Sequence, residues 1–112
     1  IPQYVEVEKV SSDNPELISK LLAKRGCNKV LWECGPRLAT AAIKSGCINE
    51  IITFIAPKIL GGDISMNPFG DFEFQEMNEI IELSESDFSF IGNDICLKSS
   101  LKNINFTSKL HN

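Results

Sequence analysis

The chain has 112 residues, which fits a single domain, and its 43% hydrophobic and 23% charged residues give an ordinary composition with a net charge of −4. The acidic balance, without a basic run that alternates with aromatic residues, argues against a nucleic-acid surface. No apolar stretch is long enough to span a bilayer, and the first ten residues carry no signal-peptide pattern. We therefore expect a cytoplasmic protein without nucleic-acid or membrane partners. Those ten residues also lack an initiator Met, so we expect the chain to begin inside a longer gene product or after processing.

The first predicted unit is a strand followed by a helix. Residues 4–10 alternate apolar with acidic side chains, a pattern that predicts a half-buried strand. Asn14 suits a helix N-cap and Pro15 the first helical position. An apolar stripe of leucine and isoleucine then predicts a helix that packs on the core, and Gly26 is placed to end it.

Residues 28–46 predict a second strand and helix around which the rest of the chain is organised. Apolar residues 30–32 form the short strand, and Pro36 suits the first position of the helix, with Gly35 at its N-cap. Gly46 stands where a left-handed C-terminal residue is wanted. A helix that begins at the end of a buried strand directs unpaired N–H groups into the crevice there, which favours binding of an anion, usually a phosphate.

Two charged residues flank this predicted anion site. Glu33 is the last side chain of the strand and faces or flanks the crevice. Arg37 places a cation in the first helical turn, where the helix dipole disfavours it. A bound phosphate would explain that placement, and a merely solvated side chain is the alternative. Gly35 lets the backbone approach a ligand closely.

The cysteines favour neither a metal site nor a disulfide framework. No Cys-x-x-Cys pair occurs, and the single histidine, His111, lies in the tail. We interpret the four cysteines as reduced and mostly buried residues, with disulfides as the alternative: Cys27, Cys34, Cys47 and Cys96.

A third strand is predicted at residues 50–60, which are apolar on both faces, as in strands of parallel sheets that are covered on both sides. Pro57 closes this strand or confines it to an edge. The first half of the chain thus reads β-α-β-α-β and predicts a sheet with parallel pairs.

The second half predicts a long loop and a terminal hairpin. Residues 63–78 form the loop, to which we assign no chemistry, and its three phenylalanines would anchor it on the core or on a partner subunit. Residues 80–91 contain two strand-like runs, either separate or one bent strand, broken at residues 84–87. A turn at residues 92–94 and alternation at residues 95–101 complete an antiparallel hairpin. We expect a frayed tail at residues 102–112, after a folded part at residues 1–101.

Several motifs together resemble the C-terminal part of the reductase domain of the bifunctional riboflavin-biosynthesis deaminase/reductase. Residues 31–39 contain Glu-Cys-Gly-Pro where the family has Glu-Gly-Gly-Pro or Glu-Ala-Gly-Pro. Residues 48–50 are similar to the start of the family's next strand, and residues 55–62 contain its Ala-Pro-Lys and Leu-Gly-Gly. Residues 90–97 are similar to its closing hairpin. The resemblance runs from about residue 4 to residue 101.

The resemblance implies an α/β, dihydrofolate-reductase-like three-layer sandwich, present here as a partial domain. Its mixed sheet would combine the parallel β-α-β-α-β part with the C-terminal antiparallel hairpin. The implied activity is NADPH-dependent reduction of 5-amino-6-(5-phosphoribosylamino)uracil to the ribitylamino form. The family's substrate-binding glutamate falls on Glu33. No catalytic residue or metal ligand is assigned, and the family's NADPH-contacting segment falls on Gly35, Pro36, Arg37, Leu38, Ala39, Thr40 and Ala41.

The chain departs from the family in two respects. Cys34 replaces a glycine or alanine, and the larger thiol could crowd the turn. The N-terminal half of the reductase domain and the zinc deaminase motifs are absent from this sequence, so we expect the isolated fragment to be inactive. The alternative is a structural or dimerisation fragment, a homodimer that pairs through the edge of strand 50–60. An unrelated α/β phosphate-binding domain is a third hypothesis.

Overall fold

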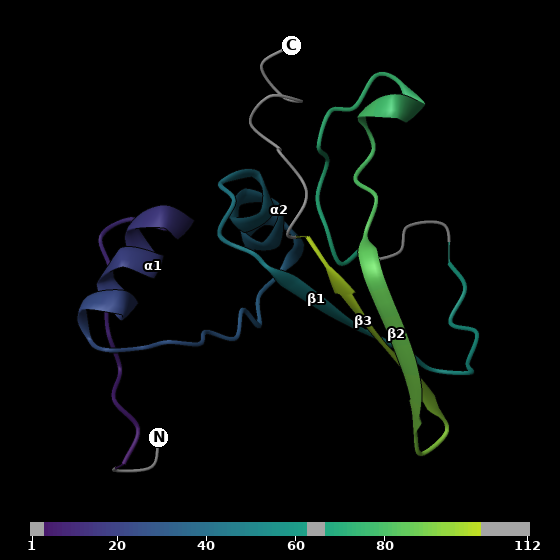
Figure 1. The fold of residues 1–112 in the computed structure, drawn as a ribbon, viewed down its shortest axis with the longest axis horizontal. Helices are drawn as coiled ribbons and strands as arrows, with labels where there is room; N and C mark the ends of the chain where they lie inside the picture. The colour runs from purple at the N-terminus through teal and green to yellow at the C-terminus, as the bar shows by residue number, and fades with distance from the viewer. Residues whose placement is uncertain (1–3, 63–66, 102–112) are drawn as a thin grey trace.

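The computed structural model describes residues 4–62 and 67–101 (Figure 1). The tail at residues 102–112 and part of the predicted loop lie outside these described residues. None of the described helices is long and apolar enough to cross a membrane. The elements, in chain order, are α1 (Pro15–Lys24), α2 (Pro36–Lys44), β1 (Glu50–Ile55), a short 3-10 helix η1 (Met77–Glu79), β2 (Ser84–Ile91) and β3 (Asp94–Ser100).

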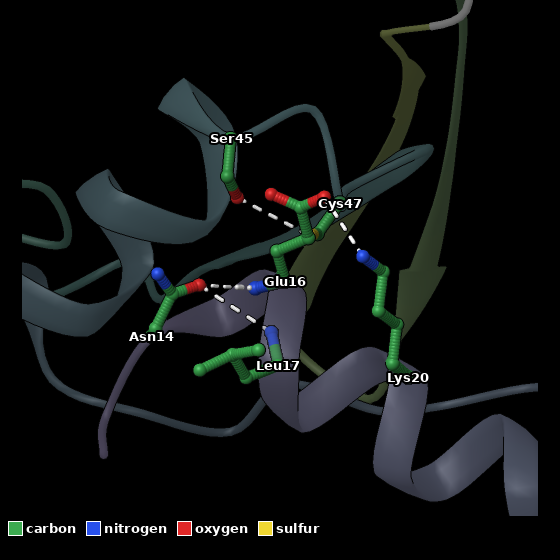
Figure 2. A network of polar contacts seen from close by, with 6 residues as sticks. All are labelled: Asn14, Glu16, Leu17, Lys20, Ser45 and Cys47. Atoms are coloured by element: carbon green, nitrogen blue, oxygen red, sulfur yellow. Dashed lines mark hydrogen bonds and ion pairs between the residues drawn. The ribbon is translucent and has the colours of Figure 1, made fainter.

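Helix α1 begins where its capping sequence predicts. The Asn14 side chain accepts hydrogen bonds from the backbone N–H groups of Glu16 and Leu17 at 2.9 and 3.4 Å (Figure 2). Pro15 occupies the first helical position, where its missing N–H has no intrahelical partner. An exposed ion pair between Lys20 and Glu16 lies along the next turn at 3.4 Å. These local interactions explain why this helix boundary can be predicted from sequence.

Helix α2 also has the predicted boundaries. Gly35 is its N-cap and Pro36 its first residue. At the other end Gly46 has a φ of 77°, and its N–H donates to the Ile43 carbonyl at 3.1 Å. Glycine adopts this left-handed conformation without the steric cost that a Cβ would add.

The sheet has three antiparallel strands in the order β1-β3-β2. Ile91 pairs with Asp94, so the predicted turn is a two-residue hairpin loop, and the predicted terminal hairpin is confirmed. The predicted run at residues 80–83 is not a strand, so neither two separate strands nor one bent strand forms over residues 80–91. Residues 84–87 instead belong to β2, which starts at Ser84 and contains a bulge between Ser84 and Asp87. Within the bulge Glu85 has a positive φ of 51°, which bends the strand while pairing continues.

The predicted parallel part of the sheet does not form within the described residues. Residues 5–10 and 29–35 have no regular secondary structure, and the described neighbour of β1 is β3, which runs antiparallel to it. β1 ends at Ile55, two residues before Pro57, and most of its side chains are exposed rather than covered on both faces. Alternation marks which face a strand would bury, but a strand also needs a neighbouring backbone to pair with. No described segment supplies one to residues 5–10 or 29–35.

A small core lies where α2 and the loop meet one end of the sheet (Figure 1). Its centre is Ile43 of α2 with Leu101, whose N–H donates to the Asn49 carbonyl at 2.9 Å. The loop phenylalanines pack against this centre, so they anchor the loop on the core, which was one of the two predicted roles. The half-buried residues around it are Ile48, Ile51, Phe69, Phe72, Phe74 and Ile81.

Candidate functional site

The start of α2 presents two backbone amides without a hydrogen-bond partner among the described residues. Gly35 has an ordinary extended backbone and, lacking a side chain, caps no N–H group. The N–H of Ala39 donates to the Gly35 carbonyl at 3.1 Å, which leaves the amides of Arg37 and Leu38 free. A side-chain cap would normally bond these two positions. Free amides at the positive end of a helix dipole are favourable partners for an anion.

Arg37 and Glu33 are both exposed beside these amides. Neither side chain takes part in an ion pair within the described part of the chain, where Arg25 instead binds both Glu6 and Glu8. The guanidinium of Arg37 is therefore available to an anionic ligand. Glu33 lies two residues before the N-cap of α2, and its carboxylate is available to a polar ligand.

The predicted crevice around these residues is not enclosed by the described structure. The segment before α2 is not a buried strand, and its side chain at Leu31 is 79% exposed. An open hollow of about 270 Å³ lies elsewhere, between residues 9–12 and the apolar face of α1. The free amides of Arg37 and Leu38 therefore lie on an open surface of the described residues.

The remaining predicted cofactor residues are less accessible, because they lie along the packed side of α2. Thr40 is only 7% exposed, and its hydroxyl donates to the Pro36 carbonyl at 2.8 Å and accepts from the N–H of Gly70 at 2.6 Å. Its side chain therefore contacts the loop and not the solvent. Gly70 is not among the predicted site residues, because a glycine followed by Asp71 indicates only a turn. The other predicted residues are half-buried: Pro36, Leu38, Ala39 and Ala41.

All four cysteines are free thiols, in agreement with the prediction, but they are not mostly buried. Only Cys96 is buried, in the central strand β3, while Cys47 is half-buried and Cys27 and Cys34 are exposed. The exposure of Cys34 leaves room for its thiol beside the turn before α2. Among the described residues, no group of three or more histidine, cysteine, aspartate or glutamate side chains could hold a metal ion.

The fold is an α/β domain in which the start of α2 presents free backbone amides on an open surface of the described residues. The model of the family described as the RibD C-terminal domain matches residues 4–97, and the chain belongs to this family. It is 35% identical over 100 residues to the chloroplastic riboflavin biosynthesis protein PYRR of Arabidopsis thaliana, covering 89% of this chain. It is 39% identical over 80 residues to the riboflavin biosynthesis protein RibD of a Synechocystis species, covering 71% of this chain.

A solved structure of Acinetobacter baumannii RibD has the same fold over most of the chain. The match covers 86% of this chain with a TM-score of 0.65 and 25% sequence identity. The chain spans only 25% of that solved chain, and 17% and 22% of the lengths of the Arabidopsis and Synechocystis relatives. It therefore corresponds to a limited part of each relative.

Proposed function

We propose that the chain is the C-terminal portion of an NADPH-dependent reductase of riboflavin biosynthesis. The reaction would convert the ribosyl group of 5-amino-6-(5-phosphoribosylamino)uracil to the ribityl form. Family membership and the names of the relatives, which are riboflavin biosynthesis proteins, support the pathway. The observation that carries the proposal for the site is the pair of free amides at the start of α2 beside an unpaired Arg37.

The residues at this helix terminus fit the phosphate end of a dinucleotide. The amides of Arg37 and Leu38 would donate to phosphate oxygens, and the guanidinium of Arg37 would add a charge-assisted contact. Space around Gly35 is open, since a Cβ built there meets no atom within 4 Å. A phosphate can therefore approach the backbone without a side chain in its way.

Glu33 would bind the substrate beside the cofactor. Bound NADPH would supply the hydride for reduction of the anomeric carbon of the ring-opened imine, whose nitrogen would take up a proton. The carboxylate of Glu33 would either accept hydrogen bonds from the substrate's polar groups or orient the group that delivers this proton. The first role would position the substrate and the second the proton donor, and misplaced reacting groups cost orders of magnitude in rate.

The proposal is tested by titrating the protein, purified at its native length, with NADPH while following the cofactor's fluorescence. Saturable binding is expected, together with reductase activity that falls at least 10-fold in Glu33→Gln, by loss of the charge-assisted contacts of the carboxylate. Glu82→Gln is the matched control, because Glu82 is also an exposed carboxylate and lies in the segment before β2. Absence of NADPH binding by the parent protein would show that the cofactor assignment is wrong, and full activity of Glu33→Gln would show that the role given to Glu33 is wrong.

A second candidate function, assembly into a homodimer, is supported by the uncovered face of the hairpin. Ile55, Ile95 and Phe90 are paired across the three strands and therefore share one face of the sheet. Phe90 is 72% exposed and Phe88, on the same face, is 67% exposed. Contiguous apolar surface of this kind marks an interaction site. A second copy of the chain would bury it and would need no catalytic activity.

Sedimentation over a wide concentration range shows whether the protein is a monomer or a homodimer. A dimer that dissociates in Phe90→Lys supports assembly through this face, because the substitution would bury a charge. Lys98→Gln, on the opposite face of the sheet, is the control. A strict monomer at high concentration would eliminate the homodimer without affecting the reductase proposal.

A further inference from the structure

The loop that the sequence left without a role contacts the candidate anion site directly. The N–H of Gly70 donates to the Thr40 hydroxyl at 2.6 Å and lies 3.3 Å from the Pro36 carbonyl oxygen. The Thr40 hydroxyl itself donates to the same carbonyl at 2.8 Å. One carbonyl at the start of α2 is thus held by a helix side chain and by a loop backbone group that is 30 residues further along the chain.

The Pro36 carbonyl belongs to the same peptide group as the N–H of Arg37, one of the two free amides. Because a trans peptide is planar, its C=O and N–H point in opposite directions, and fixing the first fixes the second. Gly35 provides no side-chain cap that would order this turn from the other side. This carbonyl also accepts the helical bond from the backbone N–H four residues on. The bonds from Thr40 and Gly70 add to that bond and restrain the direction of the Arg37 N–H further. Hydrogen bonds to a carbonyl also polarise the peptide and strengthen its N–H as a donor.

Aromatic packing holds the loop end of this contact. Phe72 stacks on Phe74 with ring centroids 5.3 Å apart. The centroid of its ring lies 6.5 Å from that of the tilted Phe69 ring. The ammonium group of Lys44, in the last turn of α2, lies 5.7 Å from the centroid of the Phe72 ring. These contacts hold the loop along α2 and keep the backbone of Gly70 next to the first turn of this helix.

We propose that Thr40 and Gly70 are positioning residues that orient the Pro36–Arg37 peptide so that its N–H receives a phosphate of the dinucleotide cofactor. This inference rests on the proposed function, and it assigns Thr40 a role different from direct cofactor contact. It also accounts for the glycine, since a Cβ at Gly70 would lie 3.2 Å from the Thr40 hydroxyl oxygen and 3.7 Å from the Pro36 carbonyl oxygen. A larger residue would therefore require the Thr40 hydroxyl or the loop to shift by a few tenths of an ångström.

The test compares Thr40→Val, which removes the hydroxyl and keeps the shape, with Thr40→Ser, which keeps the hydroxyl. For the protein at its native length, Thr40→Val is expected to raise the Kd and KM for NADPH about 5- to 10-fold, the effect of one hydrogen bond, with kcat changed less than about 2-fold. Thr40→Ser is expected to restore the parent's values. Gly70→Ala should raise the same constants while leaving Thr40 intact.

The control is Ser45→Ala, which removes a hydroxyl bonded to the Ala42 carbonyl and to Cys47 at the far end of the same helix (Figure 2). It is expected to leave NADPH affinity unchanged. Melting temperatures are measured for every variant, so a general loss of folding is recognised. If Thr40→Val and Gly70→Ala fold and bind NADPH as tightly as the parent, the positioning role is overturned while the proposed function stands. Absence of NADPH binding by the parent would overturn both.

Discussion

Replacing Gly35 with aspartate should stabilise the protein and at the same time weaken cofactor binding. Gly35 has φ −71° and ψ 174°, a conformation that any residue adopts, and a Cβ there meets no neighbouring atom. The new carboxylate can accept hydrogen bonds from the free amides of Arg37 and Leu38. It also places a negative charge at the positive end of the α2 dipole. Both effects act on the donors that we assign to the cofactor phosphate.

The magnitudes follow from these two interactions. Relative to glycine, an acidic cap contributes a few tenths of a kcal/mol through hydrogen bonding and a similar amount through the dipole, about 0.7 kcal/mol together. For a domain of this size that corresponds to a rise of about 3 °C in Tm. NADPH affinity should fall at least about 10-fold, since the phosphate would lose both amides and face a like charge.

Thermal unfolding and NADPH titration measure the two effects in the same samples. Gly35→Asn is the matched variant, because asparagine caps the amides without adding charge. It should raise Tm by a smaller amount and weaken NADPH binding less than the aspartate. An unchanged Tm together with unchanged NADPH affinity for Gly35→Asp would refute the view that this helix terminus is both free and the phosphate site.

Three further changes test the local interactions that hold the helices. Asn14→Ala should lower the free energy of unfolding by about 1 kcal/mol, because it removes the α1 cap. Urea denaturation measures this loss with Asp13→Ala as the control, and equal stability of the two variants would contradict the prediction. Gly46→Ala should cost about 1 kcal/mol in the same assay, as φ is 77° there, and a neutral result would contradict the strain argument. Arg25→Gln should cost about 0.5 kcal/mol at low salt and less in 1 M NaCl, since its pairs with Glu6 and Glu8 are solvent-exposed; a salt-independent loss would count against the ion pairs.

Features that depend on neighbours in sequence were predictable. The N-cap at Asn14, the proline starts of both helices and the glycines that end them act within one helical turn. The two-residue hairpin loop between β2 and β3 is equally local. For the same reason the sequence located the candidate site at the start of α2. The free amides there follow from a glycine cap followed by a proline.

Pairing partners and side-chain environments were decided by the tertiary structure. Alternation at residues 5–10 marked an apolar face, but the described fold places no strand beside it, and β1 pairs antiparallel with β3. The contact between Thr40 and Gly70 joins residues 30 positions apart, and no local pattern encodes it. Capping and turn energies arise within a few residues, whereas strand pairing and loop docking depend on which distant segments the folded chain brings together.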